Sequence, residues 1–232
     1  MSQEILASLH GGLIVSCQAY PGEPLREPHI MTAMAQAAVL GGAIAIRAQG
    51  LQDIALMRRT LDVPIVGLVK VGTDGVFITP TVADCVAVAQ AGADIVAFDG
   101  TTRRRPGGES LADCVDAIQD QGALAMADCG SEGDAVASTA AGVDCVATTL
   151  AGYTGERPPT DGPDFELLAN LVRQSDVPVL AEGRVRTPED AVRCLEMGAH
   201  AVVVGSSITH PTTITARYAK AISPRVPDLT TR

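Results

Sequence analysis

The sequence predicts an α/β protein that folds as a single (β/α)8 barrel, the TIM barrel, and three observations support this. Short apolar runs alternate with helical segments along the whole chain, and we count eight such strands. Strict alternation indicates parallel strands joined by right-handed crossovers. Eight strands in 232 residues favour a closed barrel over an open doubly wound sheet. No G-x-G-x-x-G motif follows the first strand, so the dinucleotide-binding fold lacks its fingerprint.

The strands are predicted at short aliphatic runs rich in Val, Ile and Ala. Such runs lack a polar face, which is typical of parallel strands buried on both sides. We expect strands at residues 12–18, 43–47, 63–70, 94–99, 123–128, 144–149, 178–182 and 199–205.

Helices are predicted between these strands, where apolar residues recur at helical spacing. We expect them at residues 2–9, 29–40, 51–60, 81–91, 109–121, 132–141, 165–174, 188–197 and 211–222. A Gly that ends a helix directly before a strand recurs in the related tetrapeptides at 91–94, 141–144 and 197–200. We therefore expect one domain over residues 1–232, with a loose tail at about 224–232.

The composition limits the partners and the compartment. A net charge of -10 and a pI near 4.7 argue against nucleic acid or an anionic membrane surface as a partner. No apolar run reaches the ~18 residues of a membrane span, and the N-terminus lacks the pattern of a secretory signal. Six cysteines without a C-x-x-C pair are expected to be reduced and structural, which predicts a cytoplasmic protein.

Lys70, at the end of the third predicted strand, is a candidate catalytic residue. Lysine is rare here, because Lys220 is the only other one among the 17 Lys and Arg residues. An amine, unlike a guanidinium, becomes a neutral base when burial and neighbouring charge lower its pKa. The alternative is a strand-end lysine that extends its charge into water.

Polar and ionisable residues collect at the carboxyl ends of the predicted strands, where barrels of this kind place the active site. In chain order they are Gln18, Arg47, Lys70, Asp99, Asp128, Thr148, Thr149, Glu182, Gly205 and Ser206. Five charged groups that converge on one mouth indicate a catalytic centre.

A phosphate site is predicted after the last two strands. Gly183 and Arg184 follow the seventh strand, while Gly205 and Ser206 follow the eighth and open a short helical turn. Loops in these two places, with backbone amides at a helix N-terminus, are the usual phosphate cradle of this barrel. The alternative is that the glycines only form tight turns. We expect a phosphorylated small-molecule substrate.

Lys70 and Glu182 are predicted to exchange protons with the substrate. The third and seventh strands lie on opposite sides of an eight-stranded barrel, so the two side chains would face each other. Two such groups suit inversion at a carbon acid, because one removes a proton and the other delivers one from behind. Arg47 and burial would lower the pKa of Lys70, and burial would raise that of Glu182. The alternative for Glu182 is a salt bridge with Arg184 or Arg186.

The two aspartates at strand ends are predicted to orient the substrate. No His joins Asp99 and Asp128 at a strand end, so we expect no metal site. Their spread over two strands suits hydrogen bonds to sugar hydroxyls or to Lys70. The run of three arginines at 103–105 is expected to be a solvated loop face.

Taken together, several segments resemble the N-acetylmannosamine-6-phosphate 2-epimerase family, from Gly11 to about Ile222. They are Leu13-Ile14-Val15-Ser16-Cys17-Gln18-Ala19, Ala45-Ile46-Arg47-Ala48, Gly67-Leu68-Val69-Lys70, Phe77-Ile78-Thr79-Pro80-Thr81, Met126-Ala127-Asp128, Thr148-Thr149-Leu150-Ala151-Gly152-Tyr153-Thr154 and Ala181-Glu182-Gly183-Arg184. The order and spacing of these segments carry the resemblance.

The resemblance implies a phosphate-binding barrel, like the ribulose-phosphate-binding barrels, without redox cofactor or metal. It implies that the protein interconverts N-acetylmannosamine 6-phosphate and N-acetylglucosamine 6-phosphate in amino-sugar catabolism. It assigns the exchange of the C2 proton to Lys70 and Glu182. It assigns substrate handling to Gln18, Arg47 and Asp128, and Thr148 is a further candidate for substrate binding.

Two positions depart from the family pattern. Val71 stands where the family has Arg after the lysine, and His210 replaces an active-site Arg before Pro211, so His210 is also a candidate substrate-binding residue. Two other functions stay open at this point. One is a Schiff-base aldolase or lyase that uses Lys70 as nucleophile, and the other is a non-catalytic phosphosugar-binding barrel. A homodimer is the default expectation for the assembly.

Overall fold

Eight parallel strands close into a barrel in the order in which they occur along the chain, as the sequence predicted. The structure is a computed structural model that describes residues 2–223, so the predicted tail at about 224–232 lies outside the described residues. The strands are β1 (Leu13–Cys17), β2 (Ala45–Gln49), β3 (Ile65–Leu68), β4 (Ile95–Asp99), β5 (Leu124–Asp128), β6 (Cys145–Ala147), β7 (Val179–Glu182) and β8 (Ala201–Val204).

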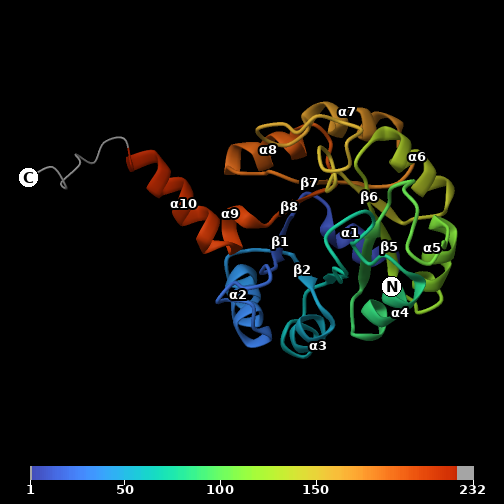
Figure 1. The fold of residues 1–232 in the computed structure, drawn as a ribbon, viewed down its shortest axis with the longest axis horizontal. Coiled ribbons are helices and arrows are strands. Elements are labelled where there is room, and N and C mark those ends of the chain that lie inside the picture. Colours follow the sequence, from blue (N-terminus) through green and yellow to red (C-terminus); the bar gives the residue numbers. More distant parts are fainter. Residues whose placement is uncertain (1, 224–232) are drawn as a thin grey trace, which may run out of the picture.

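Helices surround this barrel, and each lies close to its predicted place (Figure 1). They are α1 (Ser2–Leu9), α2 (Pro28–Leu40), α3 (Leu51–Thr60), α4 (Val82–Gln90), α5 (Leu111–Gln119), α6 (Glu132–Ala140), α7 (Phe165–Gln174), α8 (Pro188–Glu196), α9 (Ser206–Thr209) and α10 (Pro211–Ile222). Capping boxes begin three of them, at Thr81, Ser110 and Thr187, where the side chain accepts from the third amide of the helix.

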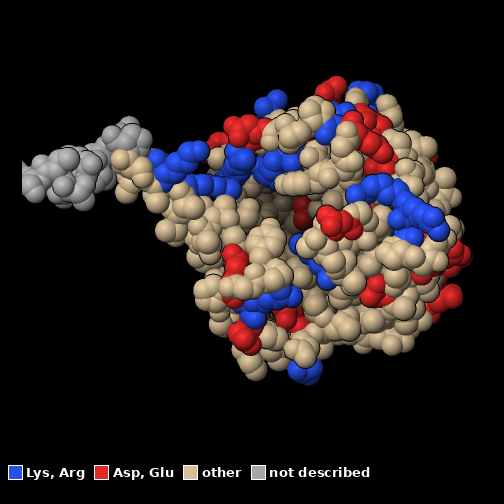
Figure 2. Space-filling model, in the orientation of Figure 1, with Lys and Arg blue, Asp and Glu red and all other residues tan. Residues whose placement is uncertain are grey.

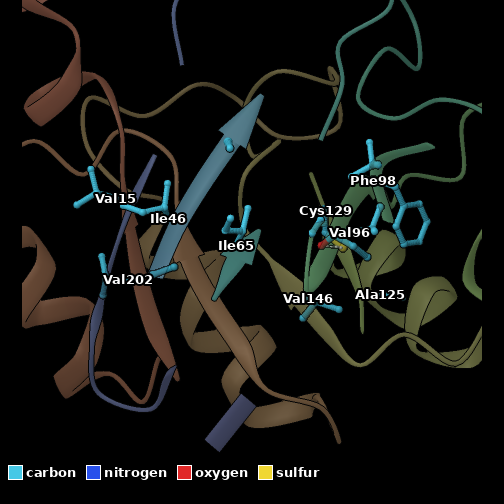
Figure 3. Close-up of a cluster of buried hydrophobic side chains, with 14 of the residues drawn as sticks. Val15, Ile46, Ile65, Val96, Phe98, Ala125, Cys129, Val146 and Val202 are labelled. Atoms are coloured by element: carbon cyan, nitrogen blue, oxygen red, sulfur yellow. Dashed lines mark hydrogen bonds between the residues drawn. The ribbon is translucent and has the colours of Figure 1, made fainter. Parts of the chain in front are cut away.

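The core has two aliphatic layers because successive side chains of a strand point to opposite faces. In β4, for example, Ile95 and Ala97 pack inside the barrel, while Val96 and Phe98 pack against the helices. Figure 3 shows part of the outer layer. Leu9 of α1 belongs to the inner layer, so α1 closes the amino end of the barrel. All six cysteines are free and buried. Within residues 2–223, no helix combines the length and apolar character that crossing a membrane requires.

The third strand is shorter than predicted, and this changes the setting of Lys70. β3 ends at Leu68, and Lys70 lies beyond it in an isolated antiparallel bridge with Ile78. Backbone hydrogen bonds from Thr79 to Val69 (2.8 Å) and from Val71 to Phe77 (2.9 Å) close this hairpin. Lys70 is therefore held by its own loop rather than by a neighbouring parallel strand.

The last helix does not complete the ring around the barrel. α10 leaves the barrel beside α9 and points away from it (Figure 1). None of its residues, all of which the structure describes, is buried. Tyr218 and Ile222 are 71% and 57% exposed, so these two apolar side chains are largely uncovered by the described chain.

Candidate active site

A cavity of about 620 Å³ opens at the carboxyl ends of the strands. Its charged lining residues are Arg26 of the β1–α2 loop, Lys70 of the β3–α4 loop, and Glu182 and Arg184 at and after the end of β7. Figure 2 shows the hollow near the middle of this face, with basic and acidic atoms at its edge. The cavity lies where the sequence predicted the active site.

Lys70 lines the cavity and is mostly buried. Burial lowers its pKa, and the positive charge of Arg47 acts in the same direction. Glu182 and Asp128 oppose this shift, because a negative charge favours the ammonium form. The ammonium nitrogen lies 5.6 Å from the ring centroid of Tyr20. The predicted direction of the Lys70 shift is confirmed, and burial outweighs Arg47 as its cause.

Glu182, the last residue of β7, lines the cavity from the opposite side of the barrel. Burial raises its pKa to about 7, against the influence of Arg47. The predicted direction is confirmed. Its carboxylate accepts a hydrogen bond from Arg47 Nη1 (2.9 Å), and Thr149 Oγ1 lies 3.2 Å from the same oxygen. The alternative of a salt bridge with Arg184 or Arg186 is wrong, because the cationic partner comes from inside the barrel.

Arg47 and Asp128 form a buried ion pair beneath the cavity. The guanidinium donates to both carboxylate oxygens of Asp128, at 3.0 and 2.5 Å, and each side chain is at most 1% exposed. A bidentate geometry of this kind compensates for the loss of hydration. Neither residue lines the cavity. Instead, Arg47 hydrogen-bonds to Glu182 and Asp128 to Thr149, and these two partners do line it. Their predicted role in substrate handling stays a prediction.

The two threonines after β6 have different roles. Thr148 is buried and exchanges hydrogen bonds with the backbone of Glu182, donating to its carbonyl (2.8 Å) and accepting from its amide (3.0 Å). Thr149 lines the cavity and donates to Asp128 at 2.6 Å. Thr148 thus positions Glu182, and Thr149 is the one that a substrate can reach. Sequence reasoning placed both at the strand end and selected Thr148.

The predicted phosphate loops meet at one wall of the cavity. Gly183 (φ 106°) and Gly205 line it together with Ser206. A side chain at Gly205 would come within 3.3 Å of the Ser16 side chain, so the backbone there has close neighbours. In α9 the amides of Ile208 (2.9 Å) and Thr209 (3.0 Å) donate to the Gly205 carbonyl, which leaves those of Ser206 and Ser207 as the candidates for binding an anion at this wall.

Arg184 lines the cavity, but its guanidinium is engaged by the β6–α7 loop. It donates to the carbonyls of Ala151 (2.9 Å) and Gly162 (3.0 Å) and to the Thr160 hydroxyl (3.0 Å). It also lies 5.2 Å from the ring centroid of Tyr153. Arg184 therefore holds this loop against the cavity mouth.

Gln18 and His210 line the cavity from the side of β1 and α10. Gln18 donates to the Ser16 hydroxyl at 2.8 Å. The ring nitrogens of His210 both have protein partners, since Nε2 lies 2.5 Å from Glu23 and Nδ1 contacts the Thr213 hydroxyl.

Two predictions at the end of β4 are wrong. Asp99 is buried and does not line the cavity, because it accepts from Thr101 Oγ1 (2.6 Å) and Arg103 Nη2 (2.7 Å) instead. The backbone of Ile78 covers this strand end by accepting from the Asp99 amide at 2.9 Å. The arginine run is only partly solvated, because Arg105 is buried and donates to the Asp99 carbonyl.

Sequence reasoning missed two residues that shape the mouth. Tyr20 and Tyr153 line the cavity and are 54% and 64% exposed. The signal was present, because the chain has only three tyrosines and no tryptophan. Both tyrosines follow strand ends in long loops. Within residues 2–223, no three His, Cys, Asp or Glu side chains gather in a group that could hold a metal ion.

Comparison with known proteins agrees with this geometry. Residues 31–224 match the family model described as "Putative N-acetylmannosamine-6-phosphate epimerase". A Cutibacterium acnes protein named "Putative N-acetylmannosamine-6-phosphate 2-epimerase" is 51% identical over 95% of this chain and 98% of its own length. The chain belongs to the N-acetylmannosamine-6-phosphate epimerase family.

Solved structures support the same family assignment. The N-acetylmannosamine-6-phosphate 2-epimerase from Clostridium perfringens superposes with a TM-score of 0.91 at 42% identity, over 94% of this chain and 96% of that one. A dihydropteroate synthase from Yersinia pestis has a TM-score of 0.60 at 13% identity, which shows a shared fold alone. The (β/α)8 barrel is therefore common to distant proteins, whereas sequence identity links this chain to the epimerase family.

Proposed function

We propose that this protein inverts C2 of N-acetylmannosamine 6-phosphate to give N-acetylglucosamine 6-phosphate, and catalyses the reverse reaction. The observation that carries the proposal is a pair of proton-transfer groups on opposite strands of one cavity. Burial lowers the pKa of Lys70 and raises the pKa of Glu182 to about 7, and both shifts favour exchange of protons with the substrate. Membership of the family supports the choice of sugar phosphate.

The reaction we propose begins from the open-chain sugar, whose C1 aldehyde acidifies the C2 proton. Lys70 takes that proton as a neutral amine, and the electrons of the C2–H bond move onto the aldehyde oxygen. Glu182 in its protonated form then delivers a proton to the other face of C2, and the aldehyde forms again. In the reverse direction the two residues exchange roles, as microscopic reversibility requires.

Residues around this pair are proposed to hold it in place. Arg47 and Thr149 fix the Glu182 carboxylate, and Asp128 balances the Arg47 charge. The backbone at Gly183, Gly205 and Ser206 would bind the phosphate, with Gln18 near the sugar. We propose that this chemistry uses neither metal nor redox cofactor. The scattered cysteines and the acidic surface support a cytoplasmic enzyme without a nucleic-acid partner.

A homodimer is part of the proposal. α10 leaves the barrel and exposes Tyr218 and Ile222, which lie four residues apart on one side of the helix. A second copy would cover these side chains, and burying apolar area stabilises association. Light scattering coupled to size exclusion should give twice the mass of 23.9 kDa. A monomer at micromolar concentration would contradict the dimer but not the activity.

One assay tests the function. Each sugar phosphate is incubated with enzyme in EDTA, and formation of the other epimer is followed by NMR. We expect interconversion from both sides to the same equilibrium. With sodium borohydride present, an aldolase working through a Schiff base would leave a substrate-sized adduct on Lys70, which mass spectrometry would detect. Such an adduct, or failure to interconvert the epimers, would contradict the proposal.

A further inference from the structure

The β1–α2 loop is tied to α10 by a chain of contacts that ends on Lys70. Glu23 is the centre of this chain, since its carboxylate accepts from the Tyr20 amide at 2.9 Å and lies 2.5 Å from His210 Nε2. The Tyr20 ring packs edge-on against His210, with centroids 5.1 Å apart. The same ring lies 5.6 Å from the Lys70 ammonium.

The hydrogen-bond partners of His210 indicate which of its ring nitrogens carries a proton. The Thr213 amide can only donate, and it donates to Nδ1 at 3.3 Å. Nδ1 is therefore the acceptor of the ring, and Nε2 carries the proton that it donates to Glu23. The Tyr20 amide and His210 together hold the pKa of Glu23 below its ordinary value, so Glu23 is ionised at neutral pH. With both nitrogens engaged, His210 has no free polar atom to offer to a substrate.

We propose that Tyr20, held in place by the Glu23–His210 pair, is a positioning residue that covers Lys70 and keeps water away from its amine. His210 then acts on the reaction through Glu23 and Tyr20 rather than by contact with the sugar phosphate. The consequence for the rate rests on the proposed function, whereas the consequence for the state of Lys70 does not.

Two effects of the Tyr20 ring on Lys70 oppose each other. A cation near an aromatic face is stabilised by about 0.5–1 kcal/mol at exposed sites, and 5.6 Å is close to the ~6 Å limit of this interaction. Exclusion of water destabilises the cation, and full burial lowers a lysine pKa by about 3–5 units. Burial is the largest cause of the lowered Lys70 pKa, so we expect the exclusion of water by the Tyr20 ring to outweigh the attraction of the ring for the cation.

Replacement of Tyr20 leaves the other charged groups near Lys70 unchanged. They are Arg47 from β2, Asp128 from β5 and Glu182 from β7, whose charges influence the Lys70 pKa. Tyr20 contacts the amine from the β1–α2 loop. Removing its ring should therefore admit water to Lys70 without changing the charges below it. Tyr20 is 54% exposed, so its replacement should leave the fold intact.

The test measures the titration of the Lys70 amine directly by NMR. Because Lys70 and Lys220 are the two lysines of the chain, protein labelled with ¹³C at the lysine side chain gives two Cε signals, and Lys220→Arg assigns them. In the unliganded wild type we expect the Lys70 midpoint to lie below the ordinary range of a lysine. In Tyr20→Ala the Lys70 midpoint should rise by about half a unit to one unit as the amine is hydrated. In Tyr20→Phe, which keeps the ring, it should stay at the wild-type value.

His210→Asn tests the connection to α10. Asparagine can still cap the Thr213 amide but is too short to reach Glu23, so α10 keeps its N-cap. We expect the Lys70 midpoint to rise, by less than in Tyr20→Ala, with a melting temperature close to wild type. His29→Gln, on the exposed start of α2, is the matched control and should leave the midpoint and the rate unchanged.

Kinetics complete the test. In Tyr20→Ala and His210→Asn the acid limb of kcat/KM should move to higher pH together with the Lys70 midpoint, in the direction of reaction in which Lys70 takes the C2 proton. An unmoved or lower Lys70 midpoint in Tyr20→Ala would overturn the proposal. So would a His210→Asn variant whose KM rises while the midpoint stays, because His210 would then bind substrate directly. A wild type that does not epimerise would overturn the proposed function alone, since the NMR titration needs no substrate.

Discussion

The carboxyl ends of β4 and β5 carry the same residue at the same height, yet only one joins the ionic network of the cavity. Asp99 and Asp128 are register partners across the two strands, and both are fully buried. Asp128 binds Arg47 and Thr149 beneath the cavity. Asp99 binds Thr101 and Arg103 of its own loop, and the hairpin after β3 covers it.

Strand register alone therefore does not decide which residue belongs to the site. An aspartate must be compensated where it is buried, and the nearest available cation decides its role. At β5 that cation is Arg47, which also binds Glu182, so Asp128 is coupled to the proposed acid. At β4 it is Arg103, which the following loop supplies locally.

Lys70→Ala should give the largest loss. A general base contributes about 10²–10⁴-fold, and the other cations of the network are arginines, which do not deprotonate. We expect turnover to fall by that factor while the melting temperature and substrate binding stay near wild type. Steady-state rates and thermal melts with and without substrate measure this. A near-normal rate would remove Lys70 from the mechanism, and a protein that fails to fold would make it structural.

Glu182→Gln should abolish epimerisation while leaving one-sided exchange. The Lys70 amine remains, so the epimer whose C2 proton faces Lys70 can still lose that proton and regain it from the same side. In D2O we expect slow deuteration at C2 of one epimer and little of the other product, observed by NMR with each sugar phosphate alone. Equal exchange into both epimers would mean that one base serves both faces.

Asp128→Asn and Asp99→Asn form a matched pair that tests the comparison directly. The negative charge of Asp128 helps to raise the Glu182 pKa, so its loss should deprotonate Glu182, with about tenfold less protonated acid for each pKa unit lost. Asp99→Asn should change kcat less than about twofold, because Asp99 contacts no residue of the cavity network. Equal losses of kcat in the two variants would show that β4 also belongs to the site.

Most of the fold could be predicted from the sequence because each strand is a short aliphatic run bounded by a helix end. The barrel, its strand order and the ring of strand-end residues follow from that alternation. Two features depend on contacts distant in sequence. Whether Lys70 ends a strand depends on the hairpin that closes through Ile78, and the place of α10 depends on what the barrel leaves uncovered.

The sequence was enough to predict which residues carry the chemistry of the site, but not which charged side chains form ion pairs with one another. Residue types at strand ends suggested Lys70 and Glu182 as the reactive pair, and the directions of their pKa shifts agree with that prediction. The sequence could not show that Arg47 would bind Glu182 in preference to the nearby Arg184. Arg184 is engaged by loop carbonyls 22 and 33 residues away in the sequence, and such contacts leave no local pattern.

The smallest expected effect is on the pH dependence of the free energy of unfolding. It should differ between Glu182 of β7 and Asp99 of β4. Glu182 has an ordinary pKa of 4.5 and one of about 7 in the folded protein, so between these values the folded state binds more protons than the unfolded state. Stability contributed by the neutral acid is therefore full below about pH 4.5 and is lost as the pH rises to about 7. Glu182→Gln should remove this loss, which is on the order of 1–3 kcal/mol in the free energy of unfolding.

Asp99 is the counterpart on β4. Burial raises its pKa above the ordinary 3.8, so its effect has the same sign but begins at lower pH. Urea unfolding of wild type, Glu182→Gln and Asp99→Asn from pH 4 to 8 measures both. We expect Glu182→Gln to flatten the decline of stability toward pH 7, and Asp99→Asn to flatten only its acidic part. If Glu182→Gln declined with pH as steeply as wild type, the carboxyl of Glu182 would be ionised throughout, and it could not serve as the acid that reprotonates C2.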